Sequence, residues 1–213
     1  MNKIKFRFYN GLKLLFLLVI CFVVKSELLL SHKSTNELNN LESIKDIEVV
    51  TTIPVETSLK NAGTRKASEV WIKMINRATG SLDIAQFYFS TKKNERLEPV
   101  IEAIIKAANR GVRIRMLVGT PVNSDMGKNT FFVLKRFRNQ SNIQVNIFNW
   151  KELTGGIHHA KYLIRDGYEI YVGSHNFDWR ALKHIHETGL RIKNRLIARH
   201  LTRIFEADWQ YNS

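Results

Sequence analysis

The chain has 213 residues, of which 44% are hydrophobic and 24% are charged; this is the composition of a globular protein and suits one domain. Its single cysteine, Cys21, excludes both a disulfide framework and a cysteine-ligated metal site. The formal net charge of +14 favours polyanionic partners such as nucleic acid or anionic lipid, with a basic surface that has no such partner as the alternative.

The first 26 residues have the pattern of an export signal. Residues 1–13 are basic and contain no acid, and residues 14–24 are a short apolar run. Val24 and Ser26 suit the −3 and −1 positions of a cleavage site, which predicts a signal peptide and a periplasmic or secreted protein. Because a lysine follows the apolar run directly, an uncleaved signal anchor that holds the protein at a membrane is the alternative.

Residues 27–46 are polar and predict a linker. Without residues 1–26 the chain still carries an excess of basic over acidic residues. Beyond residue 46, strand-like and helix-like segments alternate. This alternation predicts a single α/β domain over residues 47–213, with a mixed β-sheet flanked by helices on both faces. Strands are expected at residues 47–55, 81–89, 112–119, 142–150 and 188–193. Helices are expected at residues 65–78, 97–111, 129–140 and 195–209, and Gly111 is expected to end the second of them.

Residues 158–176 predict a β-hairpin that carries chemistry. Asp166 and Gly167 form its turn, so the start of one strand lies beside the end of the other. His159 and Lys161 share one face because side chains alternate along a strand, and Ser174 and Asn176 share a face on the return. We therefore expect these four side chains to lie together. Gly173 would let another group approach the backbone closely.

This set of side chains suits phosphoryl transfer. Lys161 would supply a cation, and Ser174 and Asn176 would supply neutral donors to the phosphoryl oxygens. Neutral His159 could attack phosphorus and form a phosphohistidine. A carboxylate would hold its tautomer, and Glu187 is the best placed in the sequence. No cluster has metal-ligand spacing, so we expect neither a metal nor another cofactor.

His159, Lys161, Asp166, Gly173, Ser174 and Asn176 together spell H-x-K-x4-D-x6-G-S-x-N. This pattern resembles the HKD motif of the phospholipase D superfamily, and the similarity extends over roughly residues 47–210. The resemblance implies that His159 is the nucleophile or the general acid and that Lys161 and Asn176 bind phosphate. It implies further that Ser174 assists at the phosphate, Asp166 supports the site as part of the catalytic set, and Glu187 orients the histidine. A residue that only forms the turn is the alternative for Asp166.

The family uses two such motifs in one active site, and this chain holds one. We therefore expect a homodimer in which two copies share one site; half of a longer two-motif protein is the alternative. The expected function is that of an exported, metal-independent nuclease acting on DNA or RNA. A phospholipase D acting on phosphatidyl lipids, and a non-catalytic envelope protein that retains the fold, are the alternatives.

Several other conspicuous residues are interpreted as structural. His158 and His175 face away from the predicted site by alternation, which indicates packing or surface roles. Tyr88 would either line a substrate channel or pack in the core. The tryptophans are expected to be core aromatics: Trp71, Trp150, Trp179 and Trp209.

Overall fold

The computed structural model of the protein describes most of the chain beyond residue 44, namely residues 45–61, 63–119, 125–148 and 150–211. The chain forms two compact units, Met1–Lys45 and Asp46–Ser213, and the second is described here. The expected export signal, residues 1–26, lies outside the described residues, as does nearly all of the expected linker. No helix in the described ranges is both long enough and apolar enough to span a bilayer.

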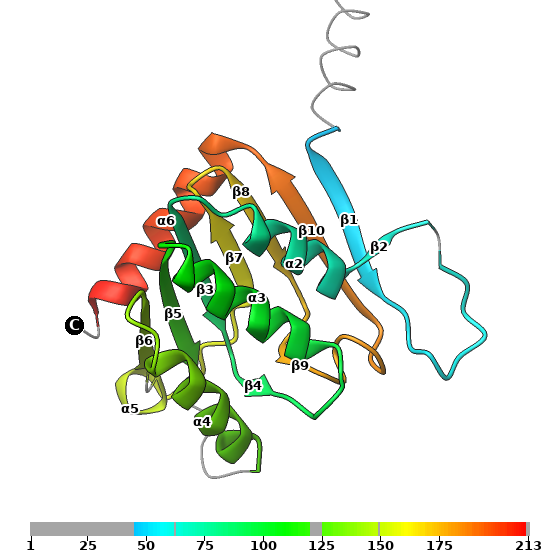
Figure 1. Ribbon diagram of the computed structural model, residues 1–213, viewed down its shortest axis with the longest axis horizontal. Helices are drawn as coiled ribbons and strands as arrows, with labels where there is room; N and C mark the ends of the chain where they lie inside the picture. The colour runs from blue at the N-terminus through cyan, green and yellow to red at the C-terminus, as the bar shows by residue number, and fades with distance from the viewer. Residues whose placement is uncertain (1–44, 62, 120–124, 149, 212–213) are drawn as a thin grey trace, which may run out of the picture. The chain divides into compact units, whose positions relative to one another are not determined.

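The centre of the domain is an eight-stranded mixed sheet with the order β2-β1-β10-β8-β7-β3-β5-β6 (Figure 1). Its strands are β1 (Ile47–Thr52), β2 (Arg65–Lys66), β3 (Ser81–Gln86), β5 (Arg113–Gly119), β6 (Ile143–Phe148), β7 (Tyr162–Arg165), β8 (Glu169–Gly173) and β10 (Glu187–Lys193). β3, β5 and β6 run parallel. The pairs β3–β7, β7–β8, β8–β10 and β10–β1 are antiparallel, and β1 pairs in parallel with β2. A separate parallel pair joins β4 (Phe89–Ser90) to β9 (Phe177–Asp178).

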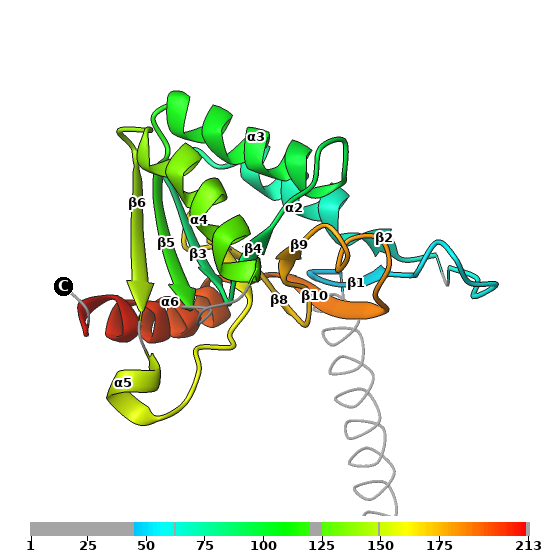
Figure 2. The same cartoon turned by 90° about the horizontal axis from the view of Figure 1, so that it is seen from below.

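Helices cover both faces of this sheet, which confirms the predicted fold class (Figure 2). The helices are α2 (Ala67–Asn76), α3 (Leu97–Asn109), α4 (Asp125–Arg138), α5 (Trp150–Thr154) and α6 (Arg195–Gln210). α2, α3 and α4 bury their apolar sides in one core cluster, which includes Trp71, Ile104 and Phe137. On the other face, α6 buries Ala198 and Phe205 in a second cluster. Two independent clusters are what a three-layer α/β arrangement requires.

Local chemistry explains where the helices begin and end. After α3, Gly111 has a φ of 93°, its N–H donates to Ala108 O over 2.9 Å, and Val112 N–H donates to Ala107 O over 3.1 Å. These two bonds form a Schellman motif, so the predicted end of this helix is confirmed. At the start of α6, the side chain of Asn194 accepts hydrogen bonds from the N–H groups of Leu196 and Ile197, as an N-cap residue does.

Several of the predicted segments are shorter than expected; the strand predicted at residues 47–55, for example, ends at Thr52. The predicted helix from residue 65 begins at Ala67, because Arg65 and Lys66 pair with β1 as β2. The predicted strand 81–89 is divided between β3 and β4, which pair with different partners. The predicted strand 142–150 ends at Phe148 and is followed by the short helix α5, which the sequence pattern did not indicate.

Part of the sheet face that carries α6 exposes apolar side chains. Val49 pairs with Leu190 and Leu190 pairs with Val172, so these three side chains lie in one row across β1, β10 and β8. Each is more than a third exposed, as is Ile47 at the end of β1. We call these four residues the open apolar face.

Candidate active site

The predicted site residues gather at one edge of the sheet. There β3 and β5 end, β7 begins and β8 ends, so that His159 and Lys161 directly precede β7 while Ser174 and Asn176 directly follow β8. The N–H of Gly173 donates to Lys161 O over 3.2 Å, which extends the pairing of the two strands up to the site. The expectation that the two ends of the hairpin meet is confirmed.

His159 is an exposed imidazole held against an aromatic ring. Its ring centroid lies 5.0 Å from that of Phe87, at an interplanar angle of 60°. Partial burial and the charge of Lys161 lower the pKa of His159 below its usual 6.5. Both effects favour the neutral imidazole, which is the form with a lone pair available for attack.

Lys161 is a buried cation whose ammonium lies close to His159. The side chain is only 5% exposed, and its Nζ donates to the backbone oxygen of His159 over 2.7 Å. The same Nζ lies 5.8 Å from the centroid of the Phe87 ring. Burial lowers the pKa of Lys161, and the negative charge of Glu187 opposes this shift. An ammonium in so dry a position interacts strongly with any phosphate that reaches it.

Ser174 and Glu187 form a pair beside this cation. The Ser174 hydroxyl donates to the Glu187 carboxylate and accepts from Thr188 N–H over 3.1 Å. Glu187 was expected to hold the tautomer of His159. Among the described residues, its carboxylate accepts the hydroxyl of Ser174, and its role toward His159 stays a prediction.

Two amide side chains at the site have polar atoms without a protein partner. Within the described part of the chain, Asn176 Oδ1 and Gln86 Nε2 are buried and form no hydrogen bond. Gln86 Oε1 accepts from Phe177 N–H over 3.1 Å, which fixes this amide at the end of β3. Unsatisfied buried polar atoms are costly, and they are common where a ligand or water supplies the missing bond.

Asp166 lies away from these residues. It sits in the hairpin turn, seven residues from His159, or about 20 Å along an extended chain. Its φ is 51° and that of Gly167 is 57°, the left-handed values that the predicted turn requires. The structure therefore does not bring Asp166 to the other site residues, because the turn carries it to the opposite end of the strands; its place in the catalytic set stays a prediction.

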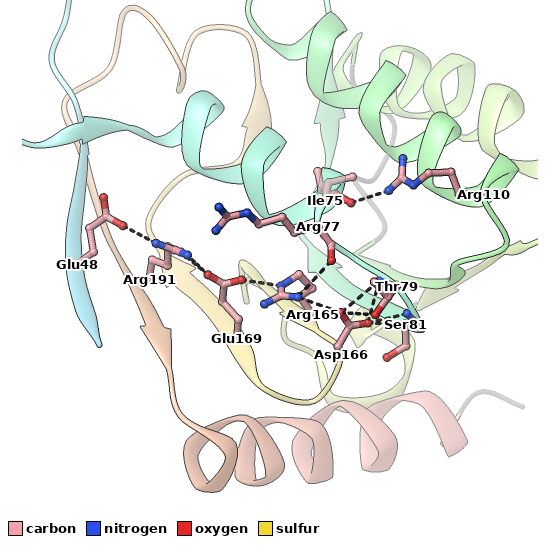
Figure 3. A network of polar contacts seen from close by, with 11 residues as sticks. Glu48, Ile75, Arg77, Thr79, Ser81, Arg110, Arg165, Asp166, Glu169 and Arg191 are labelled. Atoms are coloured by element: carbon pink, nitrogen blue, oxygen red, sulfur yellow. Dashed lines mark hydrogen bonds and ion pairs between the residues drawn. The ribbon is translucent and has the colours of Figure 1, made fainter. Parts of the chain in front are cut away.

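The carboxylate of Asp166 binds a distant segment instead (Figure 3). It accepts hydrogen bonds from Gly80 N–H over 2.8 Å and from Ser81 N–H over 2.9 Å, and Thr79 N–H donates to it more weakly. Those backbone bonds lower the pKa of Asp166, although burial opposes the shift. Asp166 thus anchors the loop that leads into β3, and β3 in turn ends at the site.

A row of alternating charges continues from this anchor across the sheet. Arg165 pairs with Asp166 and with Glu169, and Arg191 pairs with Glu169 and with Glu48 (Figure 3). Glu169 is completely buried, so both of its partners are needed to offset the cost of desolvating its charge. This row is structural and joins β1, β10, β8 and β7.

Gly173 lets other groups approach the backbone closely, as expected. A side chain at Gly173 would meet the Cα of Gly189 at 2.7 Å and the Tyr171 hydroxyl at 2.9 Å. The hydroxyl of Tyr171 also lies 2.5 Å from His175 Nδ1. Gly173 and Gly189 therefore make room for a buried tyrosine, which supports the strands below the site.

The structural interpretations are mostly confirmed. His158 and His175 are buried; the first stacks on Trp150, and the second also contacts Thr52. Tyr88 is buried and donates to Asp178 over 2.6 Å. Trp71 is fully buried, and Trp150 and Trp209 pack against the second core cluster.

Trp179 differs from the other tryptophans. It is half-buried and lies beside Lys92, Arg180 and His184, so it is not a core residue. The residue that sequence reasoning missed is Phe87, which contacts both His159 and Lys161. Phe87 directly follows β3, and this position at the end of a predicted strand could have indicated that it lies at the site.

The described residues contain no group of three or more His, Cys, Asp or Glu side chains that could hold a metal ion. The side chains that do gather are an imidazole, an ammonium, a hydroxyl and an amide. Together they offer a nucleophile and hydrogen-bond donors suited to a phosphodiester.

Known proteins share both the sequence and the fold of this domain. Residues 71–209 match the family model described as "Cardiolipin synthase, PLD-like domain". The chain is 33% identical over 173 residues to the 5'-3' exonuclease PLD3 of Bos taurus, with 76% of this chain and 34% of that protein covered. It is 29% identical over 194 residues to phospholipase D Z of Dictyostelium discoideum, with 86% of this chain and 44% of that protein covered. The chain thus spans between a third and a half of the length of these relatives.

Two solved structures have a similar fold. NucT from Helicobacter pylori superposes with a TM-score of 0.57 at 18% identity, over 67% of this chain and 86% of that one. Nuc from Salmonella typhimurium, described as a phospholipase D family member, superposes with a TM-score of 0.58 at 17% identity, over 77% of this chain and 93% of that one. At such identities the likeness concerns the fold.

Proposed function

Because the chain belongs to the phospholipase D superfamily, as a PLD-like domain, we propose that it is a metal-independent phosphodiesterase and, more specifically, a nuclease. The observation that carries this proposal is the convergence of His159, Lys161, Ser174 and Asn176 on one edge of the sheet. A phosphodiester placed there meets a neutral imidazole, a buried ammonium and the amide nitrogen of Gln86, a donor without a hydrogen-bond partner among the described residues.

In the first step, a ring nitrogen of neutral His159 attacks phosphorus. A P–N bond forms, the P–O bond to the leaving group breaks, and a second, protonated histidine gives its proton to the leaving oxygen. The negative charge on the phosphoryl oxygens increases during this attack. Lys161 stabilises that charge, together with the donor groups of Ser174 and Asn176.

In the second step, water resolves the phosphohistidine. The second histidine, now neutral, takes a proton from the water as its oxygen attacks phosphorus. The P–N bond breaks, and His159 is restored with a phosphomonoester as the product. Both histidines return to their starting protonation states, so the two half-reactions balance.

We propose that a second copy of the chain supplies the second histidine. The sequence holds one motif, and in-line displacement needs two groups on opposite sides of phosphorus. A two-fold axis supplies both from one motif. The open apolar face belongs to β1, β10 and β8, whose ends adjoin the site, and it offers a surface that a second copy would bury.

Nucleic acid is favoured over lipid as the substrate. The formal charge stays positive when residues 1–26 are left out, with 28 basic and 19 acidic residues remaining, or +9. The segments 120–130 and 149–156, which follow strands that end at or near the site edge, are polar in sequence. One named relative, the 5'-3' exonuclease PLD3, is a nuclease. Cleavage of phosphatidyl lipids is the second candidate, because the same side chains would act on any phosphodiester.

One experiment tests these proposals together. The purified protein is incubated in EDTA with plasmid DNA, single-stranded oligonucleotide, RNA and phosphatidylcholine. We expect cleavage of nucleic acid in chelator and none by the His159→Ala variant. Activity that disappears in EDTA and returns with a divalent ion would overturn the metal-free mechanism, and cleavage of lipid alone would overturn the nuclease assignment. If no substrate is cut, the non-catalytic alternative holds.

We also propose that the protein is exported, on the strength of the basic and apolar pattern in residues 1–26. The N-terminal sequence of protein recovered from the producing cells tests this. A mature chain that begins near residue 27 supports a cleaved signal, and an intact N-terminus in the membrane fraction supports the anchor.

A further inference from the structure

Helix α4 presents two neighbouring aromatic rings to solvent. Phe131 is 58% exposed and Phe132 is 66% exposed, and their ring centroids lie 6.2 Å apart at an interplanar angle of 70°. Lys135 and Arg138 are also exposed, within the next two turns of the same helix. Two large aromatic side chains in contact at the surface, flanked by cations, indicate a surface that binds a partner.

The surroundings of these rings are basic. Helix α4 contains four Lys and Arg residues and one Asp. Arg136 is paired with Glu98 and Glu102, so it belongs to the packing between α3 and α4. Lys135 and Arg138 remain on the exposed side of the helix, where their charge favours an anionic partner.

The first turns of α4 lie close to the site. The Thr130 hydroxyl accepts from Phe89 N–H over 3.1 Å and donates to Phe89 O over 2.9 Å, which joins α4 to β4. Phe89 follows Phe87 by two residues, at most about 7 Å of extended chain. The ring of Phe87 contacts His159. Figure 1 shows α4 at the end of the sheet where β5 terminates, which is the end that carries the site.

We infer that the exposed side of α4 binds an unpaired strand of nucleic acid next to the phosphate at His159. Phe131 and Phe132 stack on bases, while Lys135 and Arg138 contact the phosphates of the adjoining nucleotides. Stacking on an aromatic ring accepts any base, so this surface favours single strands without selecting a sequence. In a duplex the base faces are already stacked on one another and are not available. The inference rests on the proposed function and names the strand form of its substrate.

A membrane surface is the competing partner for aromatic and basic side chains. An interfacial helix inserts a broad apolar face between lipids. On α4 the apolar side chains of Val133, Leu134 and Phe137 are buried in the domain core, which leaves two rings for insertion. So small an apolar surface suits stacking on bases better than insertion into lipid.

The test compares the double variant Phe131→Ala/Phe132→Ala with a matched control, Leu196→Ala. Leu196 is an exposed apolar residue of α6, on the other face of the sheet. Binding of fluorescent single-stranded and duplex oligonucleotides is measured by anisotropy in a His159→Ala background, so that nothing is cleaved. Hydrolysis of a small aryl phosphodiester is measured with His159 intact.

We expect a roughly 5- to 150-fold loss of single-strand affinity for each ring removed, because base–aromatic stacking is worth about 1–3 kcal/mol. The double alanine variant should keep its duplex affinity and its rate of hydrolysis of the small diester. The control variant should keep its single-strand affinity. A Phe131→Tyr/Phe132→Tyr variant, which keeps the rings, should restore single-strand binding.

Unchanged single-strand affinity in the double alanine variant would overturn the inference and leave the proposed function standing. If the double alanine variant loses binding to anionic vesicles but still binds oligonucleotides like the wild type, the inference fails and α4 is a membrane-binding surface instead. If the wild-type protein hydrolyses neither the small diester nor an oligonucleotide, the proposed function itself fails.

Discussion

The carboxylate of Glu187 accepts the hydroxyl hydrogen of Ser174, which ties the start of β10 to the loop that follows β8. A serine hydroxyl has one hydrogen to donate, so Ser174 cannot donate to Glu187 and to a phosphoryl oxygen at once. If substrate takes this hydrogen, Glu187 loses its partner, and its carboxylate then becomes available to another donor in the site.

This competition makes Ser174 a modest contributor to catalysis. We expect Ser174→Ala to lower kcat/KM by about tenfold, the size of one neutral hydrogen bond. Lys161→Ala should lower kcat/KM by about 10²–10³, because it removes a charge from a buried position. Steady-state kinetics on one oligonucleotide substrate compares the two variants. A larger loss for Ser174→Ala than for Lys161→Ala would contradict the assigned roles.

His159 should be indispensable and shared between two copies. We expect His159→Ala to lower turnover by several orders of magnitude, since no phosphohistidine can form. When this variant is mixed with wild-type protein and the subunits exchange, heterodimers hold one histidine and cannot complete the cycle. Activity should then fall roughly as the square of the wild-type fraction. A linear decrease would show that each chain works alone.

Leu190→Lys tests the open apolar face as the contact between copies. Leu190 lies between Val49 and Val172 in the exposed row, so a charge there should disfavour burial of the face. We expect a monomer by light scattering and a loss of nuclease activity. Leu196→Lys, at an exposed position of α6, should leave the oligomeric state and the nuclease activity unchanged. A Leu190→Lys monomer with full activity would disprove the shared site.

Asp166→Ala should affect stability rather than chemistry. The substitution removes the acceptor for the backbone N–H groups of Gly80 and Ser81, at a cost of about 1–3 kcal/mol in the free energy of unfolding. Urea denaturation measures this cost. The kcat of the folded fraction should stay within a fewfold of wild type. A fall in kcat comparable to that of Lys161→Ala would show that Asp166 belongs to the catalytic set.

The buried histidine His175 should make the fold sensitive to mild acid. Burial lowers the pKa of His175 to about 4, whereas an unfolded histidine has its usual value of 6.5. Between these values the unfolded chain binds a proton that the folded chain excludes. The free energy of unfolding should therefore decrease as the pH falls from 6.5 to 4. At about 1.4 kcal/mol per pKa unit, the total contribution of His175 is about 3 kcal/mol.

Thermal or urea unfolding between pH 7 and pH 4.5 measures this dependence. A His175→Asn variant should start from a lower stability and lose less of it on acidification. His200→Asn, an exposed change on α6, should keep the wild-type slope. An unchanged slope in His175→Asn would show that other groups control the acid sensitivity. His158 is the first alternative, because burial lowers its pKa as well.

Local sequence patterns determined the hairpin that carries the site residues and the end of helix α3. The spacing from His159 to Asn176, the turn at Asp166 and Gly167, and the alternation along the strands correctly predicted the hairpin and the meeting of its two ends. The helix end at Gly111 was equally clear. These features depend on neighbours within a few residues, where backbone preference and side-chain periodicity act directly.

Only the tertiary structure decided which partners the site residues take. Asp166 meets residues 79–81, more than eighty positions earlier in the chain, because β7 pairs with β3. Glu187 meets Ser174 because β10 pairs with β8, and Phe87 reaches His159 because β3 ends beside the start of β7. Each contact follows from the order of strands in the sheet. That order is set by how the whole chain buries its two core clusters, and no local pattern of residues contains it.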